Sequence, residues 1–401
     1  MCNFVPGQVV CIGPKHLLGD LGEGLPGIIE RRPLVSDSDG IDPETPMAEL
    51  QIAILNTDPG VELFGLSKMS AALSEAIRAN KAVVDLNHYL PVSALPNSKS
   101  DPFRLSPFAQ TQVESIRRFL RSSLTVPPAT VVAVLDSGLS TEVSLHREIR
   151  FLDYSSGGRL NRDGTQSDPV GHGTRVAKIL DEILPPDVGL VVGRLPSDGG
   201  ALTALTVAQA YGDIVARSAP AVLNLSVAPR DDFFLCPHCR RVVPTPTFFS
   251  ALLPMMMRLA GKTITRTITV MAAGNSGQVA NSRWLSEDLD TLLLAVAENR
   301  RGERASYSSA PAGPWADLYS VPAFGGDDPD DEDRQGVFVD GSYGTSFAAP
   351  FISAVALFSK QFDDGPLHNT PTRLGLYTRD FMMGARQGLA LRMRQPTNGM
   401  N

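Results

Sequence analysis

Three polar side chains in this sequence are of the types that cooperate in nucleophilic catalysis. Asp136 ends the apolar run VVAVLD, His172 lies between two glycines in VGHGTRVA, and Ser346 precedes an apolar run in GTSFAAPFISAVAL. A serine hydroxyl is a weak nucleophile near neutral pH and becomes competent when an imidazole accepts its proton. The imidazole in turn needs a carboxylate that fixes its tautomer and stabilises its charged form. Together, the three residue types indicate acyl-transfer chemistry.

Each candidate also has a structural interpretation. A carboxylate at a strand end, such as Asp136, can serve the fold, and a histidine at the start of a helix, such as His172, can simply satisfy its hydrogen bonds. Ser346 can cap the helix that the spacing of the following apolar residues predicts. Asn275, in AAGNSG, either donates its side-chain NH2 to an oxygen that gains negative charge or forms a plain turn.

Four segments taken together narrow these alternatives. In this order, VAVLDSG, GHGTRVA, AAGNSG and GTSFAAP resemble the signature blocks of the subtilisin-like serine peptidases, the subtilases. The resemblance implies that Asp136 is the orienting carboxylate, that His172 is the general base and acid, and that Ser346 is the nucleophile. It further implies Asn275 as an oxyanion donor beside the backbone N–H of Ser346. The implied activity is that of a serine endopeptidase, which forms an acyl-enzyme with a protein or peptide substrate.

The substrate site is also implied by resemblance. The segment AVLNLSVAP at 221–229 is similar to the strand that binds substrate in this family. One wall of the pocket would contain Ser226, Val227 and Ala228, and the other Ala272, Ala273 and Gly274. Two residues depart from the family pattern, which commonly has glycine at the position of Ala228 and histidine at the position of Arg175. The first departure leaves the substrate preference open, and the second concerns local packing.

Apolar segments alternate with helical patterns after residue 105, which predicts an α/β domain with a parallel sheet flanked by helices at residues 106–365. Ser106 and Pro107 are expected to begin its first helix, through about residue 121. Functional groups of such sheets gather where the strands end. The Pro- and Ser-containing segment 94–105 is predicted to be a linker, and residues 366–401 a C-terminal tail.

Residues 1–93 are predicted to form a small α+β domain. β-like runs at 8–12, 27–31, 50–55 and 82–86 surround a helical pattern at 67–80. The opening VPGQVV and the closing AVVDLNHYLPV are similar to segments of the inhibitory propeptides of subtilases. The resemblance implies that this domain inhibits and chaperones the catalytic domain, and that the enzyme itself cuts the linker.

Composition excludes several classes of function. The net charge is −7, which argues against a nucleic-acid partner, and no stretch is long and apolar enough to suggest a membrane span. The first twenty residues lack the features of a secretory signal, and four cysteines are too few for a disulfide framework in 401 residues. These features favour a reducing, cytoplasmic location.

No metal or cofactor is predicted, although two segments leave the question open. The acidic segment GGDDPDDEDRQ at 325–335 fits a solvated loop better than a calcium site, because the spacing of a calcium-binding helix–loop–helix is absent. Cys236 and Cys239 flank His238 in a CxxC, which fits zinc, a local disulfide or an exposed loop.

Two further activities are compatible with the same residues. A peptide ligase or acyl transferase would use the triad with an amine in place of water. A catalytically silent module would only bind peptides, but silent relatives usually lack a triad member and all three are present here.

Overall fold

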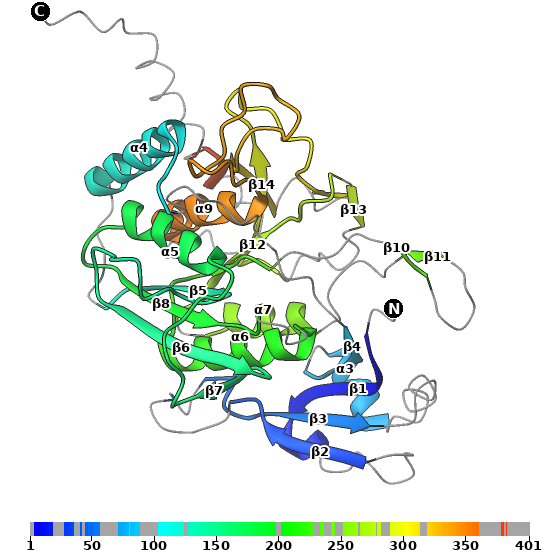
Figure 1. Cartoon of the computed structure of the whole chain (residues 1–401). Helices are drawn as coiled ribbons and strands as arrows, with labels where there is room; N and C mark the ends of the chain where they lie inside the picture. Colours follow the sequence, from blue (N-terminus) through cyan, green and yellow to red (C-terminus); the bar gives the residue numbers. More distant parts are fainter. Residues whose placement is uncertain are drawn as a thin grey trace, which may run out of the picture.

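The larger, C-terminal part of the described chain is built on one large sheet. The computed structural model (Figure 1) describes residues 4–18, 28–35, 41, 45–56, 71–79, 81–88, 103–123, 127, 129–197, 202–227, 233–235, 242–244, 252–263, 265–277, 279–281, 289–312, 319–360, 378–380 and 382. The predicted Ala228 and the CxxC of Cys236 and Cys239 lie outside these residues.

Eight strands form the sheet in the order β16-β14-β12-β9-β5-β8-β6-β7. They are β5 (Val131–Asp136), β6 (Ile149–Ser156), β7 (Arg159–Asn161), β8 (Gly189–Arg194), β9 (Val222–Leu225), β12 (Ile268–Ala272), β14 (Leu292–Glu298) and β16 (Ser320–Phe324). Every pair is parallel except β6 with β7. This arrangement confirms the predicted parallel sheet. Two short pairs lie outside it, β10 (Phe233–Leu235) with β11 (Val242–Pro244) and β13 (Val279–Asn281) with β15 (Ala310–Ala312).

Helices cover both faces of the sheet, because alternate residues of its strands point to opposite sides. Val132 and Val134 of β5 belong to the core cluster of α4 (Pro107–Ser123), α5 (His172–Ile183) and α9 (Thr345–Ser359). Ala133 and Leu135 belong to the cluster of α6 (Ala204–Ser218) and α7 (Leu252–Gly261) on the other face. Helix α4 begins at Pro107 as predicted, and the Ser106 hydroxyl accepts a hydrogen bond from the Ala109 N–H at 3.3 Å.

The N-terminal region has the predicted α+β character. Its antiparallel sheet has the order β2-β3-β1-β4, with strands β1 (Phe4–Pro14), β2 (Ile28–Pro33), β3 (Leu50–Asn56) and β4 (Val83–His88). It also contains the helices α1 (Lys15–Leu18) and α3 (Ala71–Arg78). Figure 1 shows this sheet beneath α6 and α7, on the side away from α9.

The N-terminal sheet shares one apolar cluster with two helices of the larger domain. Leu34 and Ile52 are fully buried in the same cluster as Tyr211 of α6 and Met256 of α7. A Cβ on Gly212 of α6 would lie 2.8 Å from Leu34 Cδ2, so the missing side chain makes room for this contact.

Polar contacts orient the two domains. The Asn87 side-chain oxygen of β4 accepts a hydrogen bond from the Leu205 N–H at 3.2 Å. This N–H belongs to the first turn of α6, where backbone donors lack partners within the helix.

Among the described residues, no helix is long and apolar enough to cross a membrane.

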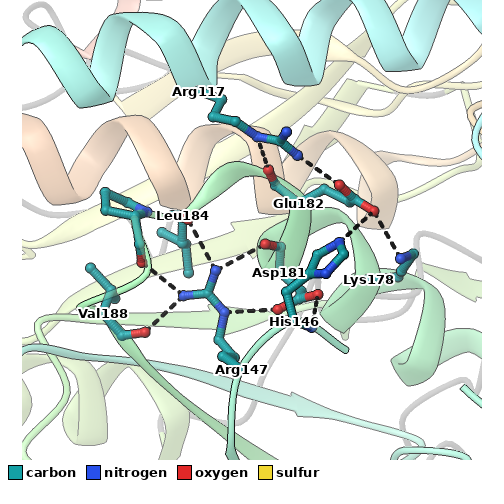
Figure 2. A network of polar contacts seen from close by, with 9 residues as sticks. Arg117, His146, Arg147, Lys178, Asp181, Glu182, Leu184 and Val188 are labelled. Carbon is teal, nitrogen blue, oxygen red and sulfur yellow. Dashed lines mark hydrogen bonds and ion pairs between the residues drawn. The ribbon is translucent and has the colours of Figure 1, made fainter. Parts of the chain in front are cut away.

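Two arginines hold the C-terminal end of α5 (Figure 2). The side chain of Arg147 is 8% exposed and its Nε donates to Asp181 Oδ1 at 2.8 Å. Its other nitrogens donate to the carbonyl oxygens of Asp181, Leu184, Pro185 and Val188. Arg117 of α4 pairs with Glu182 at 2.6 Å. Because the last carbonyls of a helix lack donors within it, these cations stabilise the end of α5.

We expect Arg147→Met to destabilise the fold by about 3–5 kcal/mol, because it leaves the fully buried carboxylate of Asp181 without its counter-ion. Urea denaturation of the full chain would measure this loss. The double variant Arg147→Met/Asp181→Leu removes both charges and is expected to recover most of it. An unchanged unfolding midpoint in the single variant would contradict this account of the end of α5.

Candidate active site

The structure brings Asp136, His172 and Ser346 into one hydrogen-bonded chain. His172 Nδ1 lies 2.7 Å from Asp136 Oδ1, and His172 Nε2 lies 2.8 Å from Ser346 Oγ. All three residues are buried, with exposed fractions of 6%, 3% and 3%. Since a carboxylate only accepts, Nδ1 carries the proton and Nε2 is free to accept from the hydroxyl. This is the geometry in which an imidazole can take a proton from a serine.

A close approach of helix to strand creates the first contact. Asp136 is the last residue of β5, and His172 is the first residue of α5. A Cβ on Gly173 would lie 2.4 Å from the Gly138 carbonyl oxygen and 3.1 Å from Asp136 Cβ. Only glycine therefore allows the first turn of α5 to reach the end of β5.

Asp168 is a part of the site that the sequence analysis missed. Its Oδ1 accepts hydrogen bonds from the Gly171 N–H and the Ser137 hydroxyl at 2.8 Å, and its Oδ2 accepts from the N–H and hydroxyl of Thr174. The Ser137 oxygen in turn accepts from the Gly173 N–H at 2.9 Å. The carboxylate thus fixes the start of α5. An aspartate just before a predicted helix is the signal that would have indicated it.

The environment of His172 favours its charged form. Burial opposes protonation of the imidazole, but the charge and hydrogen bond of Asp136, assisted by the charge of Asp168, outweigh burial and raise the pKa of His172. The positive charge of Arg175 acts in the opposite direction. A raised pKa makes this imidazole a stronger acceptor for the Ser346 proton.

Ser346 lies in the first turn of α9 but does not cap it, so the capping interpretation is wrong. The N-cap is Gly344, and it makes no side-chain capping bond. Pro350 within the helix has no N–H to donate to the Ser346 carbonyl four residues earlier. The Ser226 hydroxyl instead approaches this carbonyl at 3.5 Å. Because the Ser346 hydroxyl makes no capping bond, it is available to His172.

Asn275 is held with its amide nitrogen available. Its Oδ1 accepts from the Thr345 N–H at 2.8 Å and from the Thr345 hydroxyl at 3.0 Å. A Cβ on Gly344 would lie 3.2 Å from both Asn275 Nδ2 and Ser346 Oγ. The amide nitrogen and the hydroxyl thus border the same space, which the glycine leaves open.

The predicted substrate walls follow two neighbouring strands. Ser226 and Val227 come directly after β9, and Ala273 and Gly274 directly after β12. These strands pair in parallel, with Leu225 opposite Met271, so both segments leave the sheet at the same edge as Asp136. Ala272 is the last residue of β12. Their proposed role in binding substrate stays a prediction.

The acidic segment 325–335 is tied to nearby arginines and backbone N–H groups. Asp327 pairs with Arg300 at 2.5 Å, and Asp331 with Arg301 at 3.5 Å. Asp328 accepts from the Ser306 N–H. Within the described part of the chain, no group of three or more His, Cys, Asp or Glu side chains has the arrangement of a metal site. Whether calcium binds stays open.

The chain is similar to known proteins in sequence and in fold. A model of the subtilase family matches residues 128–383. The epidermin leader peptide processing serine protease (EpiP) from Staphylococcus aureus has a similar structure, with 12% identity, a TM-score of 0.50, and coverage of 98% of this chain and 94% of that chain. The prenylagaramide maturation protease PagA is 20% identical, with a TM-score of 0.41 and coverage of 67% and 86%. No curated protein matches the sequence significantly.

We expect the imidazole of His172 to titrate above the ordinary value of about 6.5, because Asp136 and Asp168 stabilise its charged form. Asp136→Asn should lower this pKa, because it removes the nearer charge. NMR of the ring protons across pH would measure both values. Ser346→Ala keeps both carboxylates and should retain a raised value. A midpoint that Asp136→Asn leaves in place would show that the carboxylate does not control the imidazole.

Proposed function

Since the chain belongs to the subtilase family and is a serine endopeptidase, we propose that Ser346 is its nucleophile, His172 its general base and acid, and Asp136 the carboxylate that orients the imidazole. One observation carries this proposal, the unbroken chain of contacts of 2.7 and 2.8 Å from carboxylate to imidazole to hydroxyl. The carboxylate, the imidazole and the hydroxyl that this chemistry requires come from residues far apart in the sequence.

The reaction has two steps, the formation of the acyl-enzyme and its hydrolysis. Ser346 Oγ attacks the carbonyl carbon of the scissile peptide while its proton passes to His172 Nε2. The C–N bond then breaks as Nε2 gives this proton to the leaving amine, which leaves an ester on Ser346. Water then attacks the ester carbon while His172 Nε2 takes its proton, the bond to Ser346 Oγ breaks as Nε2 returns this proton to Oγ, and the acid product departs. Asn275 Nδ2 and the Ser346 N–H donate to the oxygen that becomes negative.

Labelling with a fluorophosphonate tests the assignment. The wild type is expected to react at one residue, Ser346, and to hydrolyse a denatured protein mixture, whereas Ser346→Ala should do neither. Intact mass should also show clipping within the linker in the wild type and an uncut chain in Ser346→Ala. Sequencing of the new termini distinguishes hydrolysis from transfer to an added amine. Labelling at another residue would contradict the assignment of the nucleophile.

The N-terminal domain restrains this activity. Its sheet is anchored on α6 and α7 by a shared apolar cluster. The end of the predicted linker pairs with the loop before α9, because Leu105 pairs with Phe338 and the Val339 N–H donates to the Arg104 carbonyl at 2.9 Å. The loop that contains Phe338 leads directly to Ser346. The two described ends of this connection, β4 and Arg104, lie on the docked domain and against the loop before Ser346, which supports inhibition in cis.

We expect Leu34→Asp to raise the activity of the uncut chain several-fold, because a buried carboxylate without a partner weakens the docking of the N-terminal sheet. Peptide hydrolysis per fluorophosphonate-reactive molecule is the measurement. Arg159→Ala is the matched control, since it removes an exposed pair with Glu30, 46% and 48% exposed, of a kind worth little. Equal activity of Leu34→Asp and wild type, with docking lost, would exclude restraint by this domain.

A further inference from the structure

A buried ion pair joins the helix of His172 to the loop before Ser346. Arg175 Nη2 lies 2.7 Å from Asp340 Oδ2, and the two side chains are 4% and 0% exposed. Arg175 Nη1 also donates to the Ser342 hydroxyl. The hydroxyl and N–H of Ser342 donate to Asp340 Oδ1 at 2.6 and 3.0 Å. We call Arg175, Asp340 and Ser342 the Arg175 clamp.

We propose that the Arg175 clamp is a positioning device that holds Ser346 in register with His172. The inference rests on the proposed function and assigns a role to three residues that take no part in proton transfer. Arg175 lies one turn after His172 on α5, and Asp340 lies in the loop that enters α9. The clamp therefore joins the two elements whose separation sets the distance between imidazole and hydroxyl.

Hydrogen bonds within its own backbone hold the loop that contains Asp340 in one conformation. A restraint on Asp340 therefore also restrains the start of α9. The Val337 N–H donates to the Ser342 carbonyl at 2.7 Å, and the Gly341 N–H donates to the Phe338 carbonyl at 3.0 Å. Asp340 thus lies in a tight turn, and α9 begins at Thr345, shortly after it. A displacement of Asp340 relative to α5 would move the first turn of α9.

Aromatic packing provides a second connection between the clamp and the imidazole. The Arg175 guanidinium lies 5.3 Å from the centre of the Phe338 ring. Phe338 packs edge to face on Phe347 at 5.4 Å, and the Phe347 ring lies 5.2 Å from the His172 ring. Because Phe347 directly follows Ser346 in α9, the same contacts limit the position of both catalytic side chains.

The energetics favour a positioning role. A buried ion pair loses about as much in desolvation as it gains in attraction, and apolar replacements are often equally stable. A displacement of about 1 Å in a catalytic group, in contrast, costs on the order of 100-fold in rate. Removal of the clamp is therefore expected to reduce turnover by more than its effect on folding predicts.

The clamp also sets part of the charge around His172. The imidazole faces Asp136 from β5, Asp168 from the loop before α5, and Arg175 from its own helix, together with the Ser346 hydroxyl. Arg175 lowers the pKa of His172, and Asp340 neutralises Arg175. We therefore expect the pKa of His172 to rise when Arg175 is made neutral and to fall when Asp340 is made neutral, because the charge of Arg175 is then unopposed.

Kinetics of the full-length protein as a function of pH test the clamp. Arg175→Met and Asp340→Asn should each reduce kcat on the order of 100-fold, with a smaller change in KM. The acid limb of kcat/KM should move to higher pH in Arg175→Met and to lower pH in Asp340→Asn, because activity needs the neutral imidazole. A purely structural role would not produce opposite shifts.

Three further variants separate position from stability. Arg147→Met removes a buried arginine from the other end of α5 and should destabilise the fold without changing kcat or the acid limb (Figure 2). Arg175→Lys keeps the charge and should recover part of the lost turnover. Arg175→Met/Asp340→Leu leaves no buried charge unpaired, so it should fold even where a single variant does not, while kcat stays low.

The outcomes distinguish the two levels of the proposal. If fluorophosphonate fails to label Ser346 in the wild type, the proposed function fails and the clamp falls with it. If the wild type is labelled but Arg175→Met/Asp340→Leu has wild-type kcat, the clamp alone is overturned. Acid limbs of the two single variants that move in the same direction would also overturn it.

Discussion

The two hydrogen bonds of one imidazole set the main constraint on this structure. His172 must reach a carboxylate with one ring nitrogen and a hydroxyl with the other, at 2.7 and 2.8 Å. Asp136 comes from a central strand and Ser346 from a helix on the same face of the sheet as α5. The parallel sheet solves this problem, because its strands end at a common edge and its helices begin there. Buried charged side chains then hold α5 in place near both of its ends.

Much of this arrangement was predictable from sequence because the chemistry resides in short local patterns. The apolar runs predicted the parallel sheet, and the four family-like segments predicted which polar side chains would meet at its edge. The side chains that support the site were less visible. Asp340 pairs with Arg175 across a large separation in sequence, and no local periodicity links them. Contacts of this kind depend on tertiary packing, so a single sequence does not reveal them.

Tertiary contacts also explain why Ser346 does not cap α9. A serine before an apolar run is a good local signal for an N-cap, but Gly344 occupies that position. A capping hydroxyl would be turned towards the backbone of α9 and could not donate a hydrogen bond to His172 Nε2. The helix instead begins at Thr345, whose N–H and hydroxyl bind Asn275. The first turn thus binds a side chain from the loop after β12, and the Ser346 hydroxyl stays directed at His172.

Helix α6 links the site to the N-terminal domain in energetic terms. Its residues from Ala204 to Ala216 are all buried, on the face towards the sheet and on the face towards β4 alike. A helix that is buried on all sides requires packing partners on all sides. The N-terminal sheet provides the outer cover, with Leu34 packed against Gly212. Because this contact buries the outer face of a helix that also packs on β5, the N-terminal domain stabilises the catalytic sheet, and any restraint that it exerts on Ser346 is coupled to the stability of the catalytic domain.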